Sequence, residues 1–241
     1  MINFIKGIIV GIFNIIPGLS GCALLVIFNL YEKCIYYIST FYKKPKEKFF
    51  FLFPIALGIV LGTYSFSNII MFLLNSYQKE TYIVFTIFIL GTIPSLFKDT
   101  IKKGFRYGYL ILFFITFFIG LIFIFLDIKD LNYTIDYSFI GIIKYLFIGI
   151  VLSFSTVIPG ISSTVLLSLF GLYGIYIYSI STLNLFVLIP TLIGFIIATF
   201  FISKIINYLL NNYYSYTYFA ILGFCLSTFI SLLKVILWIL I

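Results

Sequence analysis

Long apolar runs separated by short polar stretches make up almost the whole chain. Five of these runs are continuous enough to predict helices, at residues 49–74, 81–97, 107–126, 184–210 and 216–233. A helix that crosses the hydrocarbon core of a bilayer needs about 20 mainly apolar residues. The pattern therefore predicts an all-α polytopic membrane protein in which the polar stretches connect membrane helices.

Two further apolar segments contain a Pro-Gly pair and are copies of each other. Residues 15–31 read IIPGLSGCALLVIFNLY, and residues 157–173 read VIPGISSTVLLSLFGLY. The two copies stay in register at a constant shift of 142 positions, from Pro17 and Pro159 to their closing tyrosines. Each copy places a helix-breaking pair, followed by a hydroxyl residue, inside a long apolar segment.

The similarity extends into the helices that follow the motifs. There the shift becomes 136 positions, so that Pro54 matches Pro190 and Asn75 matches Asn211. Self-similarity of this length indicates an internal duplication. We therefore predict a single membrane transport domain over 1–241, with repeat one at about 1–98, a linking helix at about 105–126 and repeat two at about 138–234.

The composition narrows the class of protein. Apolar residues make up 63% of the chain and charged residues 9%, and the mean hydropathy is +1.24, whereas soluble domains are about half apolar and a quarter charged. The net charge of +8 lies in short lysine clusters between apolar runs, which is typical of topology signals and contact with anionic lipids rather than of nucleic-acid binding. The chain has no histidine, and its three cysteines lie at no metal-binding spacing. We expect no metal site, no cofactor and no histidine-based hydrolysis.

The charges of the loops predict how the chain is threaded through the membrane. Loops 32–48 and 98–106 are basic and should be cytoplasmic, whereas loop 127–137 has three aspartates against one lysine and should be external. These assignments agree if each Pro-Gly segment is a re-entrant helical hairpin. Each half then has one hairpin and two spanning helices, and the linking span inverts the second half relative to the first. The alternative left open is that the broken segments cross the membrane fully.

The Pro-Gly breaks carry the chemistry of a binding site. Proline removes a backbone donor and glycine permits a reversal, and freed backbone groups in hydrocarbon need protein or a polar cavity around them. A helix that restarts after such a break presents unpaired N–H groups and the positive end of its dipole, which bind phosphate or carboxylate without a basic residue. Serine at the capping position adds a hydroxyl. The predicted phosphate-binding residues are Pro17, Gly18, Ser20, Gly21, Pro159, Gly160, Ser162, Ser163 and Thr164.

Two charged residues beside the motifs are candidates for a coupling or charge role. Glu32 closes the first motif, where the second copy has Gly174, and Lys144 precedes the second motif. The alternatives are an interfacial acid beside Lys33 and a lysine that extends to the membrane surface. The Pro-Gly pairs also have an alternative, as simple kinks in which serine caps its own helix, but the duplication disfavours it.

At these motifs the chain resembles the polyprenyl-phosphate translocases of the PopT type. That family has an IPGxSGG-like element with an LGxYE-like ending, and a second PGxSGS-like element with LGxY. Here residues 16–21 read IPGLSG with LYE at 30–32, and residues 158–163 read IPGISS with LFGLY at 169–173. The resemblance covers nearly the whole chain. It implies a multi-pass protein of the bacterial plasma membrane that returns undecaprenyl phosphate to the cytoplasmic leaflet for envelope synthesis, with polyprenyl phosphate and membrane lipids as partners.

The chain departs from the family pattern at a few positions, which bear on the substrate more than on the fold. Cys22-Ala23 stands where Gly-Thr is usual, Ser163 replaces a glycine, and Asn29 replaces the glycine before Leu30. The other functions left open are transport of a small soluble anion, an enzyme acting on lipid phosphates, and a non-transporting assembly factor. The lack of histidine disfavours the enzyme. Homo-oligomerisation and coupling to protons or sodium ions are also left open.

Overall fold

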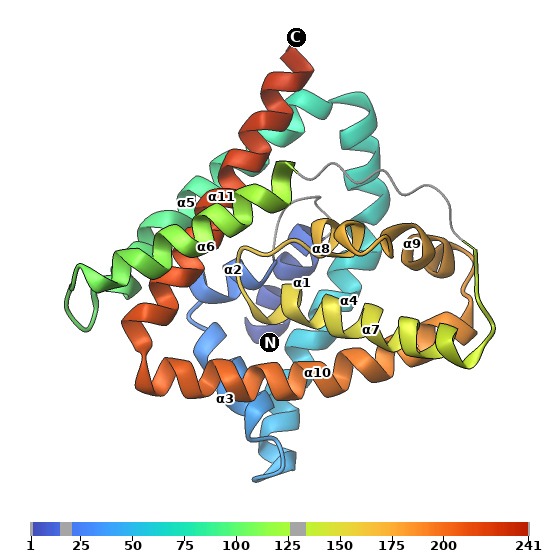
Figure 1. The fold of residues 1–241 in the computed structure, drawn as a ribbon, viewed down its shortest axis with the longest axis horizontal. Helices are drawn as coiled ribbons and strands as arrows, with labels where there is room; N and C mark the ends of the chain where they lie inside the picture. Colours follow the sequence, from blue (N-terminus) through green and yellow to red (C-terminus); the bar gives the residue numbers. More distant parts are fainter. Residues whose placement is uncertain (1, 15–20, 126–133, 241) are drawn as a thin grey trace.

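The computed structural model describes residues 2–14, 21–125 and 134–240, and the regular structure within these ranges is helical (Figure 1). The helices are α1 (Ile2–Asn14), α2 (Gly21–Ile27), α3 (Tyr31–Ser39), α4 (Pro45–Ser76), α5 (Gln78–Ile101), α6 (Gly108–Phe125), α7 (Phe139–Val157), α8 (Ser163–Leu169), α9 (Tyr173–Ser181), α10 (Leu185–Asn212) and α11 (Tyr214–Leu240).

Five helices in these ranges are long and apolar enough to cross a membrane. They are α5, α7, α10, the Pro45–Phe66 part of α4 and the Tyr214–Lys234 part of α11. Helix α1 and the Gly108–Ile122 part of α6, where the sequence predicts the linking helix, are shorter apolar helices, and α2 with α3 forms a bent pair that meets the same criterion as one unit. The prediction of an all-α polytopic membrane protein is therefore confirmed.

The same succession of helices occurs before and after α6. Helices α2 and α8 each have 7 residues, and α3 and α9 each have 9. The long helix that follows contains an internal proline in both cases, Pro54 in α4 and Pro190 in α10. Each half thus consists of an apolar helix, two short helices and two long helices.

The first helix of each half packs on the fourth through equivalent glycine contacts. Gly7 of α1 lies directly against the Ile55 carbonyl of α4, and Gly149 of α7 lies directly against the Thr191 carbonyl of α10. Shifts of 142 and 136 positions convert the first pair into the second. Small residues allow membrane helices to bring their backbones together, and here both halves use them at equivalent places.

Helices α1 and α4 run parallel to each other. Gly58 contacts Phe4 and Gly62 contacts Ile8, so residue numbers rise in the same direction along both helices. The chain between two parallel neighbours must return to the side from which it started. The chain therefore comes back between the end of α1 and the start of α4, as the hairpin interpretation requires.

The second half repeats this path. Gly194 contacts Leu146, and the Thr199 hydroxyl lies 3.1 Å from the Ser153 hydroxyl, so α7 and α10 are also parallel. A single crossing made by α1 with α2, or by α7 with α8, would make each of these pairs antiparallel. The parallel pairing therefore fits a chain that turns back between the two helices of each pair.

Each returning segment contains a second break that the apolar pattern does not reveal. Helices α2 and α3 make an angle of 110°. Asn29, which lies between them, has φ +54°, and Gly171, which lies between α8 and α9, has φ +64°. Glycine adopts this left-handed region freely, and asparagine adopts it more readily than most other residues. This explains why asparagine can stand at position 29, where the second motif has Gly171.

The two halves meet in a buried apolar core. Helix α11 packs against α5 and α6, and α10 packs against α3. Helix α6 runs parallel to α11, since Gly120 contacts Ser227 and Gly223 contacts Thr116. The core includes residues of both Pro-Gly motifs. Its buried members are Cys22, Val26, Tyr31, Ile35, Leu96, Val157, Ala198, Ile202, Ile206, Leu210, Tyr214, Tyr218, Ile221, Leu222 and Cys225.

Candidate functional site

The second Pro-Gly break is packed tightly against α11. Pro159 is fully buried, and Gly160 has φ +87°. The Thr228 hydroxyl donates a hydrogen bond of 2.6 Å to the Gly160 carbonyl. A side chain at Gly160 would come within 2.6 Å of the Cys225 backbone nitrogen. This break is therefore a packed turn held by a neighbouring helix rather than a simple kink.

The first break is described only at its two ends. Pro17, Gly18 and Ser20 lie outside the described residues, so their predicted role stays a prediction. Gly21 is buried at the start of α2. Its backbone N–H donates a hydrogen bond of 2.9 Å to the Asn14 side-chain oxygen at the end of α1. A single side chain thus links the helices that flank the first break.

The structure brings the two motifs together at the end of α7. The Tyr31 hydroxyl, from the first motif, donates a hydrogen bond of 3.1 Å to the carbonyl of Val157, which begins the second motif. The Cys22 sulfur lies 3.6 Å from the same oxygen. Carbonyls at the end of a helix lack a partner within that helix. The first motif therefore supplies hydrogen-bond donors to the helix end that the second motif leaves open.

Tyr31→Phe is expected to lower the free energy of unfolding by about 1–3 kcal/mol, because it leaves a buried carbonyl with only a weak thiol donor among the described residues. The check is the thermal unfolding midpoint of the purified protein in detergent, which should fall by several degrees. The matched control is Tyr107→Phe, at a tyrosine that is 83% exposed, which should leave the midpoint unchanged. Equal midpoints for the two variants would mean that the Tyr31 hydroxyl does not hold the motifs together.

A cavity of about 530 Å³ lies beside the second break, and we call it the hydroxyl cavity. It contains Asn14 from the end of α1 and Ser163 from the start of α8, so both halves contribute to it. Its polar lining is Asn14, Thr63, Ser155, Thr156, Ser163, Tyr176 and Thr191, and its apolar lining is Leu152, Ile161, Ile180, Leu188, Leu192 and Phe195. No charged side chain is among these lining residues.

The predicted serines of the second motif lie where a helix begins. The Ser162 carbonyl accepts a hydrogen bond of 3.1 Å from the Leu166 N–H, which places Ser162 at the capping position of α8. Ser163 and Thr164 form the first turn of that helix. Lys144, the predicted charge candidate, is exposed on α7 and lines neither the hydroxyl cavity nor the cavity described next.

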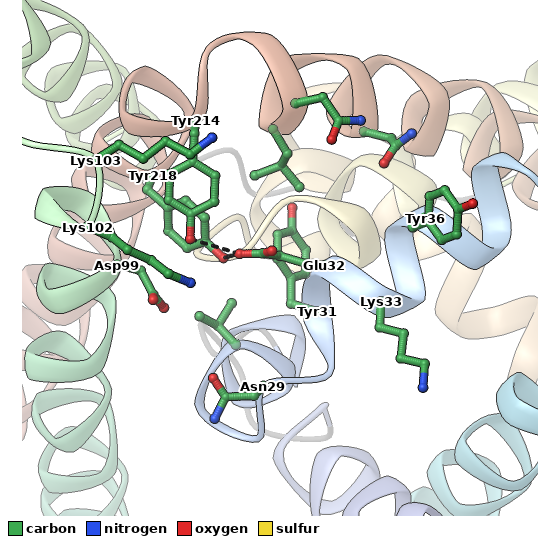
Figure 2. Close-up of a pocket in the computed structure, with 14 residues that line it drawn as sticks. Asn29, Tyr31, Glu32, Lys33, Tyr36, Asp99, Lys102, Lys103, Tyr214 and Tyr218 are labelled. Atoms are coloured by element: carbon green, nitrogen blue, oxygen red, sulfur yellow. Dashed lines mark hydrogen bonds between the residues drawn. The ribbon is translucent and has the colours of Figure 1, made fainter.

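A second cavity, of about 640 Å³, surrounds Glu32, and we call it the charged cavity (Figure 2). The hydroxyls of Tyr214 and Tyr218 donate hydrogen bonds of 2.9 and 2.7 Å to one Glu32 carboxylate oxygen, Oε1. Lys102 and Lys103, from the basic stretch after α5, also line this cavity. The sequence alone pointed to Glu32 but not to these two tyrosines or to the two lysines beside them. One signal was present, because tyrosines at positions i and i+4 lie on one face of a helix.

The described ranges contain no group of three His, Cys, Asp or Glu side chains that could hold a metal ion. Cys22, Cys34 and Cys225 are free thiols and are buried. The polar groups gathered in the two cavities are hydroxyls, amides, lysines and two carboxylates. These groups suit the recognition of an anion.

The fold and the meeting of its two broken helices define a polytopic α-helical membrane protein of the kind used for transport. A family model described as undecaprenyl phosphate translocase-like matches residues 1–106 and 99–239. A curated relative from Staphylococcus aureus (strain NCTC 8325 / PS 47), named polyprenyl-phosphate transporter, is 31% identical over 238 residues, which cover 94% of this chain and 84% of the relative. No solved structure matches the chain. The chain belongs to the undecaprenyl phosphate translocase-like family, and the resemblance inferred from the motifs is confirmed.

Proposed function

We propose that this protein moves polyprenyl phosphate, and in particular undecaprenyl phosphate, across the bacterial plasma membrane so that the carrier lipid can be reused in envelope synthesis. Family membership and the name of the Staphylococcus aureus relative support this proposal. The observation that carries it is the contact between the motifs, in which Tyr31 of one Pro-Gly segment binds Val157 of the other. That contact holds the two broken segments against each other, which supports a site shared by both.

The phosphate head group would bind in the hydroxyl cavity. The residues assigned to it are those of the sequence prediction: Pro17, Gly18, Ser20, Gly21, Pro159, Gly160, Ser162, Ser163 and Thr164. Ser163 and Asn14 line that cavity from the two halves of the chain. Hydrogen bonds to an ionised group are about twice as strong as neutral ones, so hydroxyls and backbone N–H groups can replace part of the water around a phosphate. The apolar side of the cavity suits the first carbons of a lipid tail.

The two halves would be inverted relative to each other and would alternate access to this site. The helix directions support this arrangement. If α1 and α4 point one way, then α5 points back and α6 points forward again, and α7 starts from the opposite side. Inversion also requires α6 and α11 to be parallel, and their contacts, such as Gly120 with Ser227, run parallel. With this geometry the polyprenyl tail remains in lipid while the head group crosses.

Proteoliposomes that contain undecaprenyl phosphate test the proposed function. The protein should change the fraction of lipid phosphate that is accessible from outside, without releasing inorganic phosphate. Release of phosphate would instead identify an enzyme. If neither accessibility nor phosphate release changes, with and without a proton or sodium gradient, the proposal is wrong.

Ser20→Ala combined with Ser162→Ala should reduce this transport at least about a hundredfold, because each hydrogen bond to a charged group contributes about 1.5–3 kcal/mol and the double variant loses two of them. The measurement is the initial rate of the accessibility change at a fixed lipid concentration. Ser76→Ala, at an exposed serine at the end of α4, is the matched control and should transport at the wild-type rate. A double variant as fast as this control would show that the head group binds elsewhere.

A further inference from the structure

The charged cavity is separate from the hydroxyl cavity, because the two share no lining residue. It lies between the start of α3, which supplies Lys33, and the basic stretch after α5, which supplies Lys102 and Lys103. Its lining contains these three lysines and two acids, Glu32 and Asp99. The proposed transport site makes no use of this cluster.

Glu32 occupies a place built to bind an anion. Tyr214 and Tyr218 extend from successive turns of α11, and both donate to the same carboxylate oxygen. Two hydroxyl donors that converge on one point recognise an oxyanion, because a phenol at neutral pH donates to a charged acceptor more strongly than to a neutral one. Glu32 itself is exposed, so its side chain can leave the tyrosines without unpacking the core.

The lysines complete the site. The Lys103 ammonium lies 4.7 Å from the centre of the Tyr214 ring, and that of Lys102 lies 5.8 Å from it. Neither ammonium lies within ion-pair distance of a carboxylate among the described residues, although Lys102 also interacts electrostatically with Asp99. In Figure 2 both lie on the tyrosine side of the cavity, whereas Lys33 points away from it. Two positive charges thus lie beside the Tyr214 ring in the lining of this cavity, through contacts that leave their N–H donors available.

We propose that the charged cavity is a second anion site, for a phosphate monoester, and that the Glu32 carboxylate occupies it in this conformation until phosphate displaces it. A phosphate monoester has three terminal oxygens, which two hydroxyls and two ammonium groups can bind together. With Glu32 displaced, Lys102 and Lys103 face one remaining acid, Asp99, so the cavity favours an anion over a cation. If the phosphate is that of the lipid, the cavity is a waiting position at the basic end of the transport path. Only this last assignment rests on the proposed function.

Binding of radiolabelled inorganic phosphate tests the site directly. The full chain is placed in nanodiscs of uncharged lipid, and bound phosphate is measured by equilibrium dialysis. Glu32→Gln removes the competing charge and should bind phosphate at least about fivefold more tightly than the wild type, while Lys102→Ala with Lys103→Ala should weaken binding at least about tenfold. Lys102→Arg with Lys103→Arg keeps both charges and should bind as the wild type does.

The matched control is Lys98→Ala. Lys98 lies at the same end of α5 as the other two lysines but does not line the cavity. The inference is overturned if the Lys102→Ala and Lys103→Ala variant binds as the control does, or if Glu32→Gln binds no more tightly than the wild type. The thermal unfolding midpoint of each variant shows whether it is still folded. If the double alanine variant is unfolded, the double arginine variant, which keeps both charges, provides the test instead.

A second measurement identifies the source of the phosphate. Undecaprenyl phosphate added to the nanodiscs should displace inorganic phosphate from the wild type, whereas phosphatidylglycerol, a diester, should not. Displacement assigns the site to the lipid head group, and lack of displacement assigns it to free phosphate. If phosphate binding depends on the two lysines but vesicles show no transport, the proposed function is refuted and this second site remains. If vesicles show transport but binding does not depend on the lysines, this second site is refuted and the proposed function remains.

Discussion

A single methyl group added at Gly160 is expected to abolish transport. Gly160 has φ +87°, a conformation that costs an alanine about 1–2 kcal/mol. The new Cβ atom would also lie 2.6 Å from the Cys225 backbone nitrogen and 2.8 Å from the Phe224 carbonyl carbon. Both are main-chain atoms of α11 and cannot turn aside as a side chain can. The Pro-Gly turn must therefore move away from α11, and the Thr228 hydrogen bond that holds it is lost.

Accessibility of undecaprenyl phosphate in proteoliposomes measures this effect. Gly160→Ala should reduce the rate to that of vesicles without protein. Gly104→Ala is a close control, because Gly104 has φ +89° but no atom within 4 Å of its added Cβ. It carries the same conformational cost without the collision and should transport nearly as the wild type does. If the two variants transport equally well, the packing of the Pro-Gly turn on α11 is not needed for function.

The largest effect on the fold is expected from Gly149→Val. A Cβ atom at Gly149 would collide with the Thr191 carbonyl and lie 2.5 Å from the Phe195 backbone nitrogen. Both atoms belong to the backbone of α10, so the valine must push two helices apart along their closest contact. Overpacking of a tight core costs about 1–3 kcal/mol and sometimes more, and here backbone rather than side chains must yield. We expect at least the upper end of this range, with little folded protein recovered.

The yield of monodisperse protein in detergent and its unfolding midpoint measure the change. Gly91→Val is the matched control, because Gly91 also lies in a membrane helix but has nothing within 4 Å of its added Cβ. This variant should be recovered at the wild-type level. The equivalent contact in the first half gives an internal comparison, since Gly7→Val meets the Ile55 backbone and should be similarly harmful. A Gly149→Val protein as stable as Gly91→Val would contradict the close packing of α7 on α10.

The two halves share a backbone plan but differ in how each break is held. Asn14 bridges the helices around the first break through Gly21, whereas Thr228 of α11 holds the second through Gly160. Glu32 has Gly174 as its counterpart, so the charged cavity has no equivalent acid in the second half. If the halves exchange roles as access alternates, the head group meets different surroundings at the two ends of its path.

Much of the helical architecture could be predicted from apolar run lengths. The predicted spans at 81–97 and 184–210 correspond to α5 and α10, since a membrane helix must satisfy its backbone internally over a fixed length. The breaks within the runs were harder to predict. Proline and glycine marked the first break of each motif, but the second break depends on a single residue with positive φ, Asn29 or Gly171. An asparagine in an apolar run can equally cap a helix or pair with a polar group of a neighbouring helix, so the residue alone does not signal this bend.

Part of the candidate site could likewise be predicted from the sequence, and part could not. The Pro-Gly-x-Ser motifs and Glu32 could be selected from sequence because each places a polar or helix-breaking group where hydrocarbon would otherwise penalise it. Their partners could not be selected. The Tyr31 contact with Val157 joins positions 126 residues apart, and the Tyr218 contact with Glu32 joins positions 186 residues apart. Tyrosine is common throughout this chain, with 20 copies, so no tyrosine is conspicuous by itself.

The sequence by itself determined the membrane class, the duplicated plan and the family, because these depend on local hydrophobicity and on motifs that read the same in any conformation. Only the tertiary structure decided which groups meet. It placed Tyr31 on the open end of α7, sealed Gly160 against α11, and gathered Tyr214 and Tyr218 around Glu32. These contacts depend on how far apart helices lie and which faces they turn to each other, and backbone contacts such as Gly149 against Thr191 set those distances.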